Sequence, residues 1–149
     1  MLQVGDVMPD FELKDQNGKP FNSKEIKGKK PCVLFFYPKD FTPGCTAESC
    51  GFRDRYEAFE ERGVKVIGIS SDSVKSHQKF AKFYRLPFLL LADSEQKVQR
   101  KFGVKSHFFA LLTQRITFVF NQEGKLVKVY KSHLAKGHIE ASLNAVKLF

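Results

Sequence analysis

Hydrophobic residues along this chain follow two kinds of pattern. Continuous apolar runs at residues 31–37 and 64–69 predict buried strands, because a strand covered on both faces is apolar at successive positions. A shorter run at 88–91 predicts a third strand. Elsewhere apolar side chains recur three and four positions apart, which predicts amphipathic helices. The first predicted helix covers residues 45–62. The second begins at caps within residues 71–73 and ends at about 85, and the third begins at caps at 93–94 and ends at 103. The last spans about residues 138–148.

Turn signals join the remaining apolar segments into hairpins. Asn17-Gly18 lies between two short apolar runs, a combination that favours a tight β-hairpin. Residues 121–124 form a second such turn. The two predicted hairpins join residues 11–13 to 20–21 and residues 116–120 to 126–130. Residues 104–114 have no regular period and are predicted to be irregular.

The order of these elements is a hairpin followed by β-α-β-α-β-α-β-β-α. Strands that alternate with helices are parallel neighbours joined by right-handed crossovers, and the last hairpin adds an antiparallel pair. If the strand–helix unit at residues 88–103 is an insertion, the remaining order is that of a thioredoxin-like fold. We therefore predict an α/β protein with a central mixed β-sheet flanked by helices. Because the chain has no linker-like tract or repeat, residues 1–149 are predicted to form one domain.

Composition and charge restrict the function classes. The 149 residues are 42% hydrophobic and 28% charged, which excludes wholesale disorder and a membrane channel. No apolar stretch approaches the roughly 20 residues that span a bilayer. Most of the net charge of +9 comes from residue 97 onward. Since these basic residues are scattered singly and no nucleic-acid motif accompanies them, we expect a solvated basic surface that binds neither nucleic acid nor membrane.

The chain has three cysteines, an odd and low count that argues against a structural disulfide framework. Such a count is typical of a reducing compartment, where cysteine pairs serve redox chemistry or bind metal. The four histidines have no ligand spacing relative to one another or to the cysteines, so we expect neither a metal nor a cofactor. The first residues lack a secretory signal. The expected location is the cytoplasm, or an organelle stroma or matrix if a transit peptide has been removed.

The candidate chemistry lies in residues 36–50, where a predicted strand ends and a helix begins. In open α/β sheets this edge binds ligands. Cys45 falls in the first helical turn, whose unpaired N–H groups and positive dipole end favour a thiolate over a thiol. Thr42 can direct its hydroxyl at the same sulfur. Pro43 fixes the backbone, and Gly44 allows a substrate to approach the main chain closely.

Cys50 follows five residues later in the same predicted helix. In an intact helix this spacing places the two Cα atoms about 8–9 Å apart, whereas a disulfide needs less than about 7 Å. Cys45 and Cys50 therefore cannot bond unless the first turns of the helix unwind. Gly51, a poor helix former, favours that unwinding. Such a pair is typical of a catalytic cycle rather than of a structural disulfide.

The pattern Pro38-x-x-x-Thr42-x-x-Cys45 resembles the active-site motif of the peroxiredoxins. The longer run from residue 36 to Cys50 resembles the peroxiredoxin Q branch, also called the bacterioferritin-comigratory-protein type, within the AhpC/TSA superfamily. The resemblance covers nearly the whole chain. It implies a thioredoxin-like fold and a thioredoxin-dependent peroxidase with an antioxidant role in redox homeostasis.

The resemblance also implies a role for each site residue. Cys45 would be the peroxidatic cysteine, whose thiolate cleaves the O–O bond of hydrogen peroxide or an organic hydroperoxide and becomes a sulfenic acid. Arg115 would bind the thiolate and the peroxide and lower the thiol pKa, while the Thr42 hydroxyl would orient the peroxide. Pro38 would shape the pocket. Cys50 would resolve the sulfenic acid as an intramolecular disulfide, which a thioredoxin-type dithiol reduces, so a monomer or weak homodimer is expected.

Other interpretations stay open at this point. A dithiol electron carrier would share the redox chemistry, but the C-x₄-C spacing and the absence of Trp argue against it. A redox sensor that passes oxidation to a partner would share all the local chemistry. Taken alone, Cys50 could be a buried helix residue and Arg115 a surface residue at a strand edge. Cys32 is expected to be a small core residue, and Phe108 and Phe109 to form either an apolar collar around the pocket or part of the core.

Overall fold

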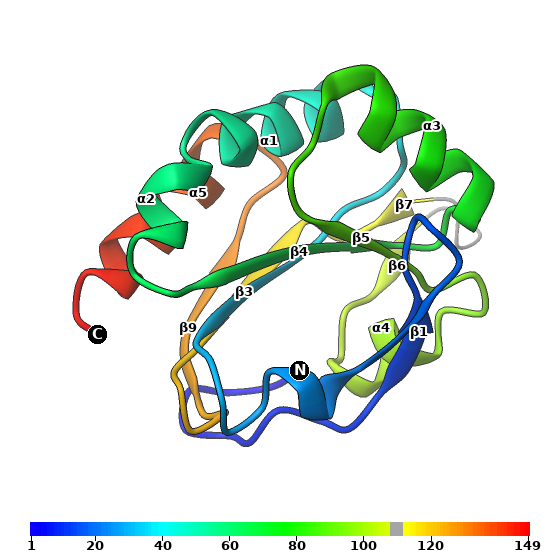
Figure 1. The fold of residues 1–149 in the computed structure, drawn as a ribbon. Coiled ribbons are helices and arrows are strands. Elements are labelled where there is room, and N and C mark those ends of the chain that lie inside the picture. The colour runs from blue at the N-terminus through cyan, green and yellow to red at the C-terminus, as the bar shows by residue number, and fades with distance from the viewer. Residues whose placement is uncertain (108–111) are drawn as a thin grey trace.

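The protein, described here from a computed structural model of residues 1–107 and 112–149, is built on a seven-stranded mixed sheet (Figure 1). From edge to edge the strand order is β2-β1-β5-β4-β3-β8-β9. These strands are β1 (Glu12–Lys14), β2 (Pro20–Asn22), β3 (Cys32–Phe36), β4 (Lys65–Ser70), β5 (Leu89–Ala92), β8 (Ile116–Phe120) and β9 (Leu126–Lys131). The other elements are α1 (Pro43–Asp54), α2 (Tyr56–Glu60), α3 (Val74–Tyr84), α4 (Lys97–Lys101), α5 (Lys136–Val146), a 3-10 helix (Ser23–Glu25), β6 (Ser106–His107) and β7 (Leu112–Thr113).

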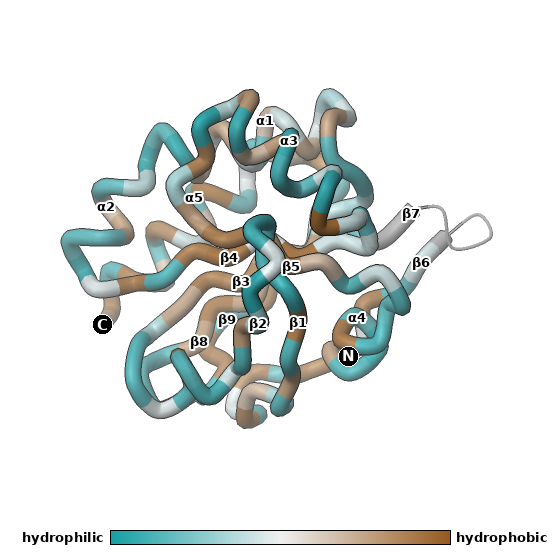
Figure 2. The backbone as a smooth tube through the Cα atoms, turned by 45° about the vertical axis from the view of Figure 1, so that its right-hand side comes forward, coloured by the Kyte–Doolittle hydropathy of each residue, from teal (hydrophilic) through white to brown (hydrophobic). Residues whose placement is uncertain are grey.

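β3 lies in the interior of this sheet, parallel to β4 and antiparallel to β8. Figure 1 shows α1, α2, α3 and α5 over one face of the sheet, and α4 with the N-terminal segment on the other. Because side chains alternate along a strand, Val33 and Phe35 pack in the core under the four helices, whereas Cys32 and Leu34 pack in the core on the α4 side. Figure 2 shows hydrophobic residues concentrated in the central strands. The sheet thus separates two apolar cores.

The structure confirms the predicted α/β fold with its central mixed sheet, flanking helices and N-terminal hairpin. The buried strands expected at residues 31–37 and 64–69 are present, as are both hairpins. Ser73 caps α3 as expected, since its hydroxyl oxygen accepts a hydrogen bond from the backbone N–H of Ser76 at 3.1 Å. Asp93 accepts from backbone N–H groups at the start of α4 in a similar way.

The helix predicted over residues 45–62 differs from the structure at its start and in its middle. It begins two residues earlier, at Pro43, because a proline fits the first turn, where an N–H would have no helical partner. At Arg55 the backbone leaves helical geometry (φ −110°, ψ 11°), which divides the segment into α1 and α2. The Arg55 side chain pairs with Glu140 of α5 at 3.1 Å, a tertiary contact at the bend that no local pattern predicts.

The segment predicted to be irregular, residues 104–114, contains the small antiparallel hairpin β6–β7. Strands of two residues are too short to have a detectable period, which is why the sequence pattern missed them. Residues 108–111 lie outside the described part of the chain, and with them the expectation for Phe108 and Phe109. Among the helices of the described ranges, none combines the length and apolar character needed to cross a membrane.

Candidate active site

The site forms where β3 gives way to α1. The antiparallel register pairs Phe36, the last residue of β3, with Ile116, the first residue of β8. Arg115 immediately precedes β8 and therefore lies beside the loop at residues 37–42 that leads into α1. Pairing within the sheet thus brings together two segments that are far apart in the sequence.

Cys45 lies in the first turn of α1, and its side chain is fully buried (0% exposed). Thr42 precedes the helix in an extended conformation (φ −75°, ψ 150°), and its hydroxyl donates a hydrogen bond to the carbonyl oxygen of Lys39 at 2.7 Å. Pro38 is half-buried at the start of the same loop. The residues of the predicted motif therefore share one short turn around the sulfur.

Arg115 contacts Cys45 from the start of β8. Its Nη1 lies 3.5 Å from the Cys45 Sγ, and its Nε donates to the carbonyl oxygen of His133 at 3.2 Å. Gly44 provides the space for this approach, since a Cβ on Gly44 would lie 2.8 Å from Arg115 Nη2. We expected Gly44 to leave room for a substrate. In the structure its missing side chain leaves room for the guanidinium.

Glu48 is a site residue that the sequence analysis missed. Its Oε1 accepts a hydrogen bond from Arg115 Nη1 at 2.7 Å, and its side chain is fully buried. The nitrogen that contacts Glu48 is therefore the same one that contacts Cys45. A signal existed, because residues three apart on a helix share a face. It was weak, since a glutamate on a helix is usually solvated.

Opposing effects set the pKa of the Cys45 thiol. Burial raises this pKa, whereas the Lys39 backbone, the Thr42 side chain and the Arg115 guanidinium lower it. Burial has the largest effect, so the net pKa lies above its usual value in this conformation, although Arg115 lowers it as expected. The buried Glu48 carboxyl accepts a hydrogen bond from the same guanidinium nitrogen.

Burial also raises the pKa of Glu48 itself, to about 7, against the lowering effect of Arg115. A carboxyl group with such a pKa is close to half-protonated at neutral pH. The charge on Glu48 therefore changes with pH near the physiological value. How strongly Arg115 stabilises a thiolate on Cys45 changes with it.

Cys50 lies in the same helix as Cys45 and is partly exposed. Because α1 is continuous across both residues, they keep the helical spacing that prevents a disulfide, and both are free thiols. Gly51 packs α1 against α5, since a Cβ there would lie 2.9 Å from Ile139 Cδ1. Unwinding the part of α1 that carries Cys50 therefore also disturbs its packing against α5.

Asp40, Asp72 and His77 bring potential metal-ligand atoms within 4.8 Å of one another, close to the loop that precedes α1. These atoms already have protein partners. Asp40 accepts hydrogen bonds from the hydroxyls of Tyr37 at 2.6 Å and Ser76 at 2.8 Å, and it lies 2.7 Å from His77 Nδ1. Asp72 accepts from the backbone N–H of Asp40 at 2.8 Å. The cluster is therefore best described as an internal hydrogen-bond network that anchors the loop.

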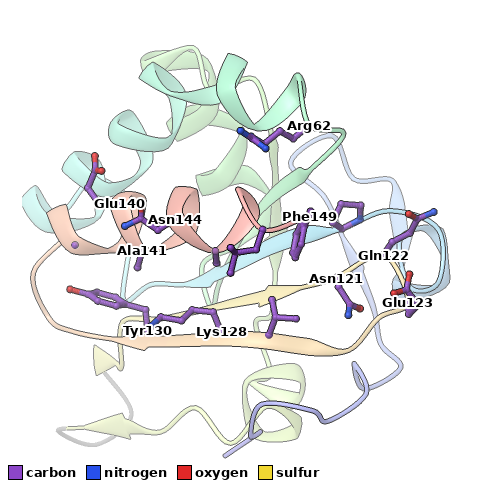
Figure 3. Close-up of a pocket in the computed structure, with 15 residues that line it drawn as sticks. Arg62, Asn121, Gln122, Glu123, Lys128, Tyr130, Glu140, Ala141, Asn144 and Phe149 are labelled. Carbon is purple, nitrogen blue, oxygen red and sulfur yellow. The ribbon is translucent and has the colours of Figure 1, made fainter.

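A cavity of about 1140 Å³ lies elsewhere, between α5 and the β8–β9 hairpin (Figure 3). Tyr130, Ala141 and Phe149 are among the residues that line it, whereas Cys45 and Arg115 are not. The cavity is therefore separate from the candidate active site.

The sequence profile of the AhpC/TSA family matches residues 4–129 of the chain. Among curated relatives, the chloroplastic peroxiredoxin Q of Sedum lineare is 45% identical over 144 residues, which cover 96% of this chain and 77% of that protein. The chloroplastic peroxiredoxin Q of Triticum aestivum is 46% identical over 147 residues, which cover 98% of this chain and 67% of that protein.

Solved structures match over the whole fold. Peroxidoxin BcpB from Mycobacterium tuberculosis has a TM-score of 0.93 and 37% identity, covering 100% of this chain and 99% of that chain. The bacterioferritin comigratory protein of Xanthomonas campestris, whose trapped intermediate and ligand complexes concern alkyl peroxide reduction, has a TM-score of 0.87 and 31% identity. That match covers 99% of this chain and 97% of the other.

Proposed function

The chain belongs to the AhpC/TSA family and is a thiol peroxidase of the peroxiredoxin Q type, and we propose that Cys45 is the sulfur that reacts with the peroxide. The observation that carries this assignment is the contact of 3.5 Å between Arg115 Nη1 and the Cys45 Sγ in the first turn of α1. A guanidinium is always charged, and a helix N-terminus favours anions, so both stabilise a thiolate. Of the three cysteines, Cys45 is the one at a helix N-terminus.

In the first step the Cys45 thiolate attacks one oxygen of the O–O bond in hydrogen peroxide or an organic hydroperoxide. The sulfur loses two electrons and becomes a sulfenic acid, and the other oxygen leaves as hydroxide or alkoxide and takes up a proton. Arg115 stabilises the charge on the sulfur and on the leaving oxygen, and the Thr42 hydroxyl orients the peroxide. Pro38 shapes the wall of the pocket.

In the second step the Cys50 thiolate attacks the Cys45 sulfenic sulfur, which forms the S–S bond and expels hydroxide, and the hydroxide takes up a proton to become water. The geometry of α1 requires the helix to unwind first, because its spacing keeps the two cysteines too far apart. A thioredoxin-type dithiol then reduces the disulfide by thiol–disulfide exchange and restores both thiols. The basic surface of the protein favours docking of an acidic reductant.

The remaining assignments follow from this cycle. Because the disulfide is intramolecular, the protein needs no second subunit, and we assign it as a monomer or weak homodimer with residues 1–149 as a single domain. The free thiols of its resting state suit a reducing compartment. The cytoplasm and an organelle stroma both meet this condition, and the curated relatives named above are chloroplastic.

Rapid-mixing kinetics test this proposal. The reduced protein is mixed with hydrogen peroxide or cumene hydroperoxide, with and without thioredoxin and its reductase, and the oxidised form is identified by mass spectrometry. We expect one equivalent of peroxide to be consumed without thioredoxin, continuous turnover with it, and a Cys45–Cys50 disulfide in the trapped product. Oxidation without turnover in the presence of any dithiol reductant would favour a redox sensor instead.

A further inference from the structure

The proposed cycle leaves one buried polar group without a role. Glu48 is fully enclosed, and only one of its carboxyl oxygens, Oε1, has a hydrogen-bond donor, Arg115 Nη1. The other oxygen, Oε2, is buried and has no hydrogen-bond partner among the described residues. An unpartnered carboxylate oxygen in a protein interior is costly, since nothing replaces the water it has lost.

Nδ1 of His138 in α5 lies 3.5 Å from Oε2. The other ring nitrogen, Nε2, lies 2.7 Å from the carbonyl oxygen of Ser132, which can only accept, so Nε2 carries a proton. Nδ1 lies 2.8 Å from the Thr117 hydroxyl. In a neutral ring Nδ1 then accepts the hydroxyl proton and has none to offer Glu48.

His138 is neutral at physiological pH, because burial lowers its pKa to about 4. Two acceptors, a carboxyl oxygen and a ring nitrogen, therefore face each other in the protein interior. This arrangement is unfavourable for an ionised Glu48. A proton on Oε2 removes the unpartnered charge, and this O–H can donate to Nδ1 when the Thr117 hydroxyl turns its own proton away, since the nitrogen has a single lone pair.

We propose that Glu48 carries a proton on Oε2 when Cys45 is a thiolate, so that the positive charge of Arg115 stabilises only the sulfur anion. This proposal rests on the proposed role of Cys45. The cluster then holds a single proton, which can lie either on the Cys45 sulfur or on Glu48. A thiol beside a carboxylate becomes a thiolate beside a carboxylic acid, and the net charge does not change. Glu48 is thus a positioning residue, whose protonation state sets how strongly the guanidinium stabilises the Cys45 thiolate.

The other groups around Glu48 are consistent with this exchange. From β8, Arg115 faces both Glu48 and Cys45 through one nitrogen. From α5 comes the neutral His138, and the ring of Tyr130 in β9 packs edge-on against it with centroids 4.8 Å apart. Arg115 is therefore the one cation these contacts bring to Glu48, and two anions compete for it. Such coupled groups titrate as a pair, and the ionisation of one suppresses that of the other.

Glu48→Gln separates this proposal from its main alternative. A glutamine resembles the protonated glutamate, with an amide oxygen for Arg115 and an N–H group toward Nδ1 of His138. If Glu48 is protonated in the thiolate form, the variant should stabilise the thiolate of Cys45. If Glu48 instead serves as a permanently charged anchor for Arg115, the variant should loosen the guanidinium and destabilise the thiolate. The two interpretations thus predict effects of opposite sign.

The experiment is a pH titration of the thiolate by its ultraviolet absorbance, in the absence of peroxide, with the Cys45→Ser form of each protein as the blank for Cys32 and Cys50. We expect the thiolate fraction of Cys45 at pH 7 to be at least about threefold higher in Glu48→Gln than in the natural protein. A lower or equal fraction overturns the proposal. Because no peroxide is used, the result does not depend on whether Cys45 is the peroxidatic residue.

Infrared spectroscopy gives a second test that does not need the Glu48 variant to fold. The carbonyl stretch of a protonated carboxyl group should persist to a higher pH in the natural protein than in Cys45→Ser, because a thiolate on Cys45 disfavours a second anion on Glu48. Cys45→Ser forms no thiolate and lacks that competition. A band that is lost at the same pH or at a lower pH in the natural protein overturns the proposal.

Discussion

Cys32 and Cys45 are both fully buried, yet they lie in different environments on opposite faces of the same sheet. Cys32 begins β3 and packs in the apolar core on the α4 side, where burial raises its pKa far above the usual value for a thiol. Cys45 packs at the edge of the core under the helices, where burial raises its pKa too, but the backbone of Lys39, a hydroxyl and a guanidinium oppose this effect.

This comparison separates burial from reactivity. Burial keeps a thiol protonated wherever it occurs, because an anion loses its hydration in an apolar interior. Donors directed at the sulfur oppose that preference, and these come from segments other than the helix that carries the cysteine. The two buried thiols therefore differ in a few polar contacts, among them that of Arg115.

Removing the sulfur at each position gives the largest expected contrast. Cys45→Ser should lower peroxide consumption by about three orders of magnitude or more, since a serine hydroxyl is not ionised at neutral pH. Cys32→Ala should keep the natural rate and lose only about 1 kcal/mol of stability. Peroxide consumption measured by rapid mixing checks both. Loss of activity in Cys32→Ala with an intact fold would contradict the comparison.

Cys50, the third cysteine, should matter for repeated turnover but not for the first reaction with peroxide. Cys50→Ser should reduce one equivalent of peroxide at the natural rate and then stop, because no thiol remains to form the intramolecular disulfide. Steady-state turnover with thioredoxin should fall to background, while the single-turnover amplitude stays at one. Unchanged turnover with thioredoxin would show that Cys50 does not resolve the sulfenic acid.

Removing the guanidinium should make Cys45 resemble Cys32. Arg115→Ala should raise the pKa of Cys45 further above its usual value and slow single-turnover peroxide reduction by about 10²–10³-fold, as expected when an electrostatic stabiliser is lost. Arg115→Lys is the matched variant, since it keeps the charge without the planar fork of donors. The pH dependence of thiol alkylation and the single-turnover rate are the measurements. Equal rates in Arg115→Ala and the natural protein would contradict this role.

A smaller change can displace the guanidinium without removing it. In Gly44→Ala the new Cβ would lie 2.8 Å from Arg115 Nη2, so the side chain must shift. We expect a loss of about tenfold in the single-turnover rate, because small displacements of a catalytic group are costly. Gly51→Ala is a useful control, since its Cβ would meet Ile139 in α5 and no site residue. A larger kinetic loss in the control would contradict the interpretation.

The smallest predicted effect concerns stability and pH. The pKa of Glu48 is about 7 in the folded protein against 4.5 for the free group, so the folded state holds its proton more strongly. This contribution to the free energy of unfolding is therefore largest at low pH and is lost as the pH rises from about 4.5 through 7. Relative to Glu48→Gln, the natural protein should gain at most about 1.4 kcal/mol per unit as the pH falls.

Urea unfolding of the two proteins at a series of pH values measures this difference. Other titrating groups cancel in the comparison, because they are common to both proteins. A difference that does not vary between pH 5 and pH 7 would show that Glu48 has the same pKa in the folded and unfolded states.

Local patterns in the sequence were sufficient for much of the fold. The apolar runs of β3 and β4 predict buried strands, and the Asn-Gly turn at residues 17–18 predicts the first hairpin, because each pattern reflects its own segment and the burial of that segment. The bend at Arg55 and the short β6–β7 hairpin were missed. The first coincides with a contact to α5, and the second is too short to have a period.

The candidate site was likewise predictable from the sequence only in part. The positions of Thr42 and Cys45 at the start of a helix follow from a proline, a glycine and the end of an apolar run, all within a few residues. The sequence by itself therefore determined where a thiolate can form and which family the chain resembles.

Only the tertiary structure decided how that thiolate is controlled. It placed Glu48 on the nitrogen of Arg115 that also contacts Cys45, and it directed the second oxygen of Glu48 toward His138 of α5. These contacts join residues 67 to 90 positions apart. Their energies depend on burial and on distances of a few ångströms, which arise when the strands pair and the helices pack over them, and no local pattern contains that information.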